Sequence, residues 1–172
     1  MKLLIRILLT IHIFSSPLFG QGTGILFQYK TSLGFVWKSF GNGEFEARYK
    51  GEITNKQPNG FGFQTYKNGD KYLGKHKNGL PNGQGRSIYV DGSMYLGQFK
   101  DGKFHGQGTF IWNDGYYHEG EFKDGTPNGQ GIETLPNGQL VGEYKNGKPW
   151  NVKGFNKNGE IISKYVNGKE QQ

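Results

Sequence analysis

The stretch YLGQFKDGKFHGQGTFIWNDG, residues 95–115, decides the fold of this chain. In its first six residues, Tyr95, Gly97 and Phe99 alternate with Leu, Gln and Lys, so in an extended chain they fall on one face. The segment GQGTFIW, residues 106–112, alternates in the same way. Alternation with a period of two predicts β-strands, and the Gly-containing turns between them predict β-hairpins.

The same pattern recurs along the chain with a fixed period. The segment YLGKHKNGLPNGQGRSIYVDG, residues 72–92, lies 23 residues earlier and repeats the glycines at the same places. A period in this range is typical of repeat proteins, in which each unit is one supersecondary element that packs on the next. Four glycine columns keep the period: Gly51, Gly74, Gly97, Gly120; Gly60, Gly83, Gly106, Gly129; Gly62, Gly85, Gly108, Gly131; and Gly69, Gly92, Gly115, Gly138.

Two kinds of turn are expected. The Asn-Gly and Asp-Gly pairs at residues 68–69, 91–92, 114–115 and 137–138 are typical of tight hairpin turns, whose central residues take positive φ. The segments NGLPNG, DGKFHG and DGTPNG are expected to form longer turns, with their prolines outside the strands because proline lacks an N–H for the ladder.

The glycines in the strands have a structural explanation. Glycine normally weakens a strand, but a bare backbone lets an aromatic ring from a neighbouring strand lie flat on it. We expect Gly106, Gly108, Phe110 and Trp112 to share one face, and the tyrosines to cover the Gly-x-Gly segments. A ladder of rings over glycine would then form the core of a sheet that has no second layer.

This pattern resembles the MORN family (membrane occupation and recognition nexus), whose motif is Tyr-x-Gly-x-aromatic, a turn Gly, Gly-x-Gly, and a Gly before the next Tyr. The resemblance covers about residues 49–147. It implies an all-β fold, an elongated single-layer antiparallel meander of 23-residue β-hairpin repeats. The residues that carry it are Tyr72, Gly74, Gly79, Gly83, Gly85 and Gly92, and then Tyr95, Gly97, Phe99, Gly102, Gly106, Gly108 and Gly115.

The chain departs from the family motif in two columns. The tyrosine column continues as His118 and then Leu140. The other departure concerns the family's usual tryptophan of the first strand, which is replaced throughout, by Ile53, His76, Phe99, Phe122 and Tyr144. These changes are expected to weaken the ring ladder in the outer units and to leave the fold intact.

The flanks resemble degenerate units. Residues 33–49 are expected to form a strand, a Gly-Asn-Gly turn and a strand, and residues 152–169 the same around Lys-Asn-Gly. Atypical end units commonly cap a repeat array. The predicted organisation is a leader at 1–20, an N-terminal capping repeat at 21–48, MORN repeats at 49–147 and a C-terminal capping repeat at 148–172.

Residues 1–20 are typical of a secretory signal peptide. Lys2 and Arg6 precede an apolar stretch, and small Gly20 suits cleavage before Gln21. The alternative is an uncleaved anchor, although the apolar stretch is shorter than the roughly 20 residues of a comfortable span. The predicted location is therefore secreted, or periplasmic or otherwise extracytoplasmic, with peripheral attachment to a membrane as an option.

Composition narrows the function classes. The formal net charge is +7, and removal of Lys2 and Arg6 with the leader leaves +5, which allows attraction to anionic partners without requiring it. Export argues against nucleic acid as that partner. The chain has no Cys, so disulfides and thiolate metal sites are excluded.

No catalytic or metal-binding constellation is visible. His76 and His118 occupy ring columns, His105 falls in a turn, and none has a metal-ligand spacing. The glutamates do not recur as a convergent pair of the kind a glycosidase needs. We therefore expect a protein that is not an enzyme and that uses no cofactor or metal.

Two features are candidates for function. One is a lysine column that closes the first strand of successive units, which is either a solubilising surface or a binding site for anionic lipid head groups. The other is a set of surplus aromatics, which either covers the sheet or forms an interaction surface. The lysine column is Lys77, Lys100, Lys123 and Lys145, and the aromatic candidates are Trp112, Tyr116, Tyr117 and Trp150.

The leading functional expectation is a scaffold that binds a protein partner or a second copy of itself. The MORN resemblance implies the same, because such arrays serve widely as assembly and membrane-associated modules. The alternative expectation is peripheral binding of anionic membrane lipids through the lysine column.

Overall fold

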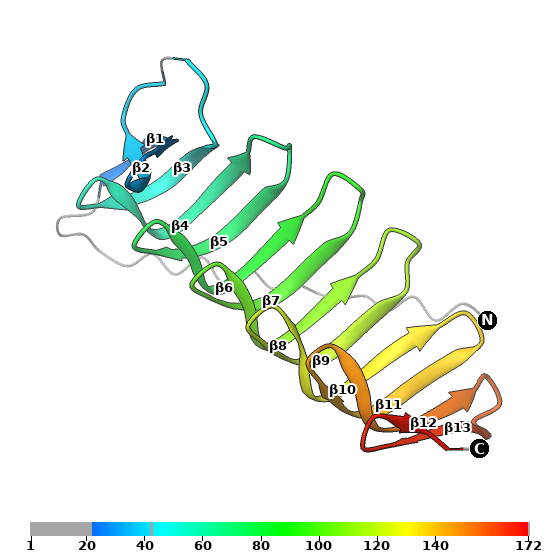
Figure 1. Cartoon of the computed structure of the whole chain (residues 1–172). Coiled ribbons are helices and arrows are strands. Elements are labelled where there is room, and N and C mark those ends of the chain that lie inside the picture. The colour runs from blue at the N-terminus through cyan, green and yellow to red at the C-terminus, as the bar shows by residue number, and fades with distance from the viewer. Residues whose placement is uncertain (1–21, 42, 172) are drawn as a thin grey trace.

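A computed structural model describes residues 22–41 and 43–171 of the chain as one open antiparallel sheet of 14 strands. The predicted all-β single-layer meander is confirmed, and Figure 1 shows the hairpins stacked along one axis. The strands are β1 (Gly22–Thr31), β2 (Gly34–Lys38), β3 (Ala47–Thr54), β4 (Gln57–Tyr66), β5 (Lys71–Lys77), β6 (Leu80–Ile88), β7 (Met94–Lys100), β8 (Lys103–Ile111), β9 (Tyr117–Lys123), β10 (Thr126–Leu135), β11 (Gly138–Lys145), β12 (Lys148–Asn156), β13 (Ile161–Val166) and β14 (Lys169–Glu170).

The hairpins curve, so the sheet forms a long trough that is open on one side (Figure 1). The tyrosine face lies inside the curve, and for this reason Tyr49, Tyr72 and Tyr95 are fully buried although no second layer covers them. We call this the ring face and the opposite one the outer face. Gln98 and Lys100, on the outer face of β7, are exposed.

Tyr49, Tyr72 and Tyr95 each lie flat on a pair of glycines, as the sequence predicts. A Cβ added to Gly108 would be 2.5 Å from Cζ of Tyr95, and Gly97 and Gly108 are paired across β7 and β8. The tyrosine hydroxyls are hydrogen-bonded as well, each to a carbonyl three residues ahead. These bonds run from Tyr49 to Glu52 at 2.8 Å, from Tyr72 to Lys75 at 2.8 Å, and from Tyr95 to Gln98 at 3.0 Å.

A second column of rings fills the space between the tyrosines. Phe99 contacts Tyr72 and Tyr95 edge to face, with centroids 4.8 and 5.1 Å apart, and Phe104 stacks on Tyr95 at 3.8 Å. Edge-to-face and stacked pairs contribute beyond the area they bury. The cluster of Tyr72, Tyr95, Phe99 and Phe122 is the centre of the core.

At most hairpins the turn types are the reverse of those expected from the sequence. Tight two-residue turns lie at the other end of the hairpins, where Asn78 and Gly79 have φ of 51° and 81°, and at the predicted end a two-residue turn joins only β10 to β11, at residues 136–137. At the 67–69 turn only Gly69 has positive φ, and the amide of Tyr66 donates to the carbonyl of Asp70 across a three-residue loop. The prediction that the central residues of the 68–69 turn both take positive φ was therefore wrong.

The prolines of the segments NGLPNG and DGTPNG, Pro81 and Pro127, lie inside strands rather than in long turns. Pro81 is within β6, opposite His76, at a bulge of the ladder between Gly74 and His76. A bulge is one of the places in a sheet where proline is tolerated. The carbonyl of Pro81 accepts a hydrogen bond of 2.9 Å from the amide of Gly102, which ties one tight turn to the next.

The bulge corrects one face assignment. Across β7 and β8, Gly97 pairs with Gly108 but Phe99 pairs with Phe104, so β8 holds two extra residues between them. Gly106 consequently has φ of 61°, and a Cβ added to it would point at the Gln98 side chain on the outer face. Gly106 therefore does not share the ring face with Gly108.

The N-terminal flank is arranged differently from the prediction. β2 and β3 do not pair with each other, because β1 lies between them and pairs with both. At the C-terminal flank, β12 and β13 pair around the turn at residues 157–159, as the sequence predicts. Within the described ranges there is no helix of the length and apolarity required to span a bilayer.

Candidate functional site

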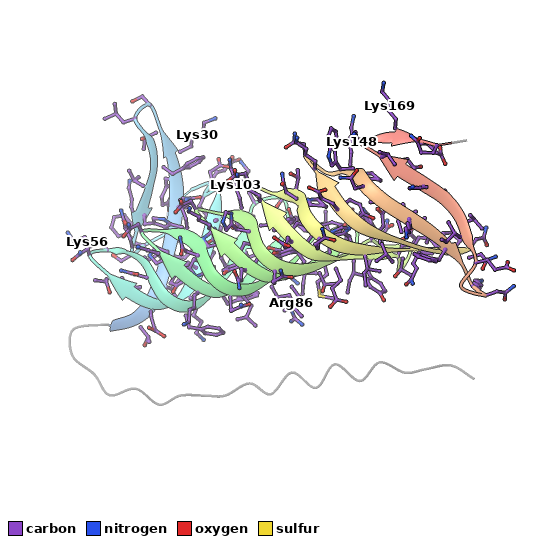
Figure 2. The ribbon with its side chains drawn as sticks, turned by 90° about the horizontal axis from the view of Figure 1, so that it is seen from below. Lys30, Lys56, Arg86, Lys103, Lys148 and Lys169 are labelled. Atoms are coloured by element: carbon purple, nitrogen blue, oxygen red, sulfur yellow. The ribbon has the colours of Figure 1, made fainter. Side chains whose placement is uncertain are left out.

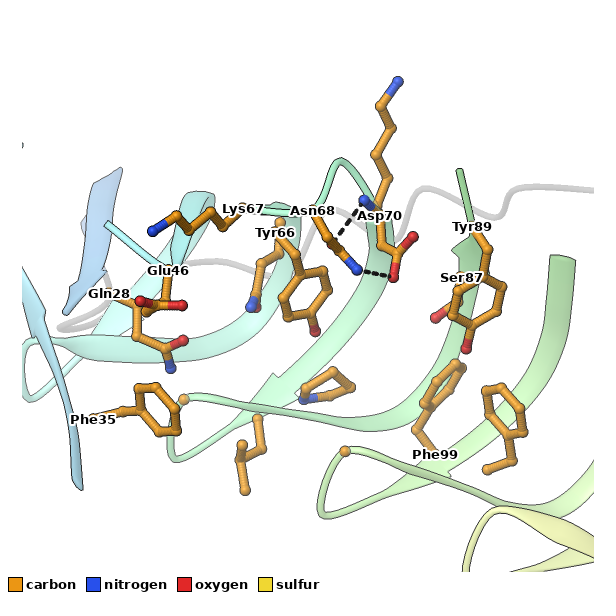
Figure 3. A pocket seen from close by; sticks show the side chains of 17 residues that line it. Gln28, Phe35, Glu46, Tyr66, Lys67, Asn68, Asp70, Ser87, Tyr89 and Phe99 are labelled. Atoms are coloured by element: carbon orange, nitrogen blue, oxygen red, sulfur yellow. Dashed lines mark hydrogen bonds between the residues drawn. The ribbon is translucent and has the colours of Figure 1, made fainter. Parts of the chain in front are cut away.

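The trough contains a pocket at its N-terminal end that no pattern in the sequence indicates. The apolar part of its lining, which we call its floor, includes Leu80, Pro81, Phe99 and Phe104. Phe35 of β2 stands at one end of the pocket (Figure 3). Phe35 is 60% exposed and Leu80 is 44% exposed, so apolar surface faces solvent here. The β1–β2 hairpin thus makes an end wall to an otherwise open groove.

Polar groups line the wall of this pocket. Tyr66 of β4, Ser87 of β6 and Tyr89, which directly follows β6, point into it, and Glu46 and Lys67 form its rim (Figure 3). Burial raises the pKa of Tyr66 to about 12, with smaller contributions from Tyr89 and Asp70, and burial also raises the pKa of Tyr89. Both phenols therefore remain neutral hydrogen-bonding groups across the physiological range.

The acidic groups nearby are held by the fold. Asp70 accepts hydrogen bonds from Nδ2 of Asn68 at 2.7 Å and from the amide of Val90 at 3.0 Å, which joins two successive turns. Lys67 forms an ion pair of 2.8 Å with Glu44. The hydrogen bond and charge of Lys67 lower the pKa of the Glu44 carboxyl, and both groups are exposed. Such exposed pairs contribute little to stability.

The lysine column lies where the sequence places it, at the ends of β5, β7, β9 and β11. Lys77, Lys100, Lys123 and Lys145 are all exposed, and each precedes a tight turn. Successive members are two strands apart, or about 10 Å at the usual strand spacing. Lys103 and Lys148, which pair with Lys100 and Lys145, add to the charge of this rim, and Figure 2 shows Lys103 and Lys148 on the opposite side of the sheet from Arg86.

The aromatic candidates do not form one surface. Trp112, Tyr116 and Tyr117 lie around the turn between β8 and β9, where Trp112 is 38% exposed and packs against Phe110 at 5.2 Å. Trp150 lies at the other end of its hairpin, next to a tight turn, with Nζ of Lys145 4.5 Å from the centre of its ring. The structure therefore divides the predicted interaction surface between two rims of the trough.

The histidines of the ring columns are buried among aromatic side chains. His76 is 3% exposed and lies between Tyr49 and Tyr72, and its Nδ1 is 3.1 Å from the carbonyl of Gly74. His118 is 1% exposed, and neither of its ring nitrogens has a hydrogen-bond partner. Burial lowers the pKa of both to about 4.

Two other expectations concern metals and the leader. In the part of the chain that the structure describes, no group of three His, Asp or Glu side chains could hold a metal ion. The predicted cleavage site at Gly20 and Gln21 lies outside the described residues.

Fold and site together define a β-hairpin repeat protein with an aromatic trough. The family model for the MORN repeat matches residues 49–71, 72–94, 95–115 and 118–140, which is more than half of the chain. The chain belongs to the MORN-repeat family. A comparison with curated proteins finds no match.

Proposed function

We propose that this chain is an exported, non-enzymatic MORN-repeat scaffold that binds a protein partner in its trough. The observation that carries the proposal is the pocket in the trough, which combines the exposed apolar side chains of Phe35 and Leu80 with neutral hydroxyls at its wall. Aromatic residues with adaptable polar neighbours are typical of protein-binding surfaces. The trough is open and elongated, and this shape suits an extended partner better than a small substrate.

The non-enzymatic part of the proposal is supported by what the reactive side chains do. Asp70 is occupied by bonds from Asn68 and Val90, and His76 and His118 are enclosed among rings. Each of these groups has a structural role. Export is supported by the sequence of residues 1–20, and the basic charge by itself does not favour nucleic acid.

A pair of leucine variants tests the trough. Leu80→Glu places a charge on the floor of the pocket, and Leu73→Glu makes the same change on the outer face, where Leu73 is 36% exposed. We expect crosslinking pull-down from the envelope or secretion fluid of the source cell to recover a partner with the wild-type chain and with Leu73→Glu. Recovery should fall at least about tenfold with Leu80→Glu, because a buried unpaired charge costs more than 1.4 kcal/mol.

Circular dichroism of both variants is the control for folding. Because both leucines are partly exposed, neither variant should change the β-sheet spectrum. Equal recovery with both variants would contradict binding in the trough, and loss with Leu73→Glu alone would move the partner to the outer face.

A second candidate function is peripheral binding of anionic lipid, and the exposed lysine rim favours it. Apart from the lysines, the charged residues of these turns are Asp101 and Asp124, so the rim is basic. Each basic residue near an anionic membrane contributes on the order of 1 kcal/mol. We expect a variant with Lys77, Lys100, Lys123 and Lys145 all changed to Gln to lose nearly all binding to vesicles that contain anionic lipid.

Vesicle flotation at two salt concentrations checks this, because charges at an exposed rim are screened within about 8 Å at physiological salt. The charge-matched control changes four exposed lysines outside the column, Lys30, Lys71, Lys157 and Lys164. Equal losses in the two variants would show only a dependence on net charge, and binding that survives high salt would remove the column from the mechanism.

A further inference from the structure

The two ends of the sheet are protected very differently. At the C-terminal end, the outermost strand β14 has two residues, Lys169 and Glu170, both charged and exposed. At the N-terminal end, β2 is outermost and its sequence is GFVWK. Short length and charge are the usual means by which proteins prevent edge strands from pairing with other chains, and β2 carries only one charge.

The β2 end also exposes apolar side chains. Leu33 is 99% exposed, Phe35 is 60% exposed and Phe40 is 61% exposed. Phe35 belongs to β2, Leu33 to the turn that precedes it and Phe40 to the segment that follows it. Isolated exposed apolar residues are common, but three at one end of a sheet are typical of an interaction surface.

The backbone of β2 has free groups for pairing. Thr31 and Gly34 close the β1–β2 turn, and the ladder continues with Tyr29 opposite Val36. Because hydrogen bonding alternates along an antiparallel pair, Gly34 and Val36 direct their backbone groups to β1, and Phe35 and Trp37 direct theirs outward. In the described part of the chain no strand pairs with this outer edge.

We propose that β2 pairs antiparallel with β2 of a second copy of this chain, about a two-fold axis at Val36. This register pairs all five residues of the strand, and it places Phe35 opposite Trp37 of the second copy and Trp37 opposite Phe35. Aromatic pairs directly across two strands stabilise a sheet. Lys38 falls opposite Gly34, so the lysines of the two copies do not face each other.

The strand is therefore complementary to itself in hydrogen bonding, ring pairing and charge, and this is why the partner is a second copy. Adding a strand to an open edge is an established mode of recognition. Five residues on each side form an interface at the small end of specific contacts, so the dimer is weak and concentration-dependent.

Cysteine crosslinking tests the register, because the native chain has no Cys. At the axis Val36 meets Val36 of the second copy as a non-hydrogen-bonded pair, with Cα atoms about 4.5 Å apart, which a disulfide can bridge. We expect Val36→Cys to form a disulfide-linked dimer under mild oxidation. Lys38→Cys, about 14 Å from its counterpart in this register, should crosslink at least about tenfold more slowly.

A variant measurement tests the dimer without cysteine. Val36→Lys places two lysines opposite each other at the axis and should shift the wild-type dimer to monomer in concentration-dependent light scattering. Phe61→Lys, on the outer face at 52% exposure, should leave it dimeric. Monomeric wild type at every concentration, or equal crosslinking of Val36→Cys and Lys38→Cys, would overturn the proposal.

These results are separable from the proposed function. Val36 does not line the trough pocket, and Leu80→Glu should leave the dimer unchanged. A trough that fails to bind a protein therefore does not affect the edge proposal, and the reverse also holds.

Discussion

Gly108→Val should lower the free energy of unfolding by about 3 kcal/mol, because the added side chain would occupy the place of a buried ring. A Cβ at Gly108 would be 2.5 Å from Cζ of Tyr95, far inside ordinary contact distance. Tyr95 cannot move away easily, since Phe99 and Phe104 pack against it with centroids 5.1 and 3.8 Å from its own. Movement of the ring would also break its 3.0 Å hydrogen bond to the carbonyl of Gln98.

The matched control is Gln107→Val, one residue away. Gln107 is exposed, and it lies on the outer face opposite Glu121. Valine at that position meets no ring, so the expected change is within about 0.5 kcal/mol. Urea denaturation of the three proteins measures both effects, and hydrogen exchange should place the loss in β7 and β8. Equal destabilisation by the two variants would show that the assignment of faces is wrong.

The faces on which Gly108 and Gln107 lie could be predicted from the sequence, and so could most of the fold. The 23-residue period, the strands and the tyrosines over Gly-x-Gly could all be predicted, because side-chain alternation and the glycine columns are local features. The position of Gly106 could not, since a bulge adds residues to β8 and breaks the period of two. Equivalent bulges in β6 and β10 accommodate Pro81 and Pro127, which the sequence pattern places in turns.

The site is less predictable than the fold for a physical reason. The lysine column follows the repeat, so its exposure at the ends of β5, β7, β9 and β11 was predictable. The pocket depends on Phe35 of β2, and β2 reaches its place only because β1 inserts between it and β3. Pairing between β1 and β3 is non-local, and adjacency in sequence favours the wrong partner, β2 with β3.

The second large effect concerns His118, which occupies the tyrosine column. Burial lowers the pKa of His118 from an ordinary value near 6.5 to about 4, and no hydrogen bond offsets the burial of its two ring nitrogens. Between these two values the unfolded chain binds a proton that the folded chain does not. The contribution of neutral, buried His118 to the free energy of unfolding is therefore fully present above about pH 6.5, and it is lost as the pH drops toward 4.

The loss attributable to His118 at pH 4 is about 3 kcal/mol, which follows from the difference between the two pKa values. His76 should contribute a similar loss, because burial lowers its pKa to about 4 as well. The carboxyls of Asp91 and Glu44, whose pKa values are lowered by hydrogen bonds from Ser93 and Lys67, lose their contribution only at still lower pH. The window between pH 6.5 and 4 therefore reports mainly on the two histidines.

His118→Tyr should remove about half of this acid sensitivity and should also stabilise the protein at neutral pH. Gly120 and Gly131 provide the same bare glycine pair that accommodates Tyr95 on Gly97 and Gly108. A tyrosine at position 118 can donate its hydroxyl to the carbonyl of Glu121, as Tyr95 does to Gln98. Replacing two unpaired buried nitrogens by one satisfied hydroxyl is expected to add about 1–2 kcal/mol at pH 7.

Urea denaturation at intervals from pH 4 to pH 8 measures the effect for the wild type, for His118→Tyr and for the double variant with His76→Phe. The wild-type curve should rise most steeply between pH 4 and 6.5, the single variant should rise about half as much, and the double variant should be nearly flat in this window. Parallel curves for wild type and His118→Tyr would mean that His118 takes up its proton in the folded state as readily as in the unfolded chain. In that case the ring column would have to open to water at this position, and the ladder would not be continuous from Phe122 to Tyr144.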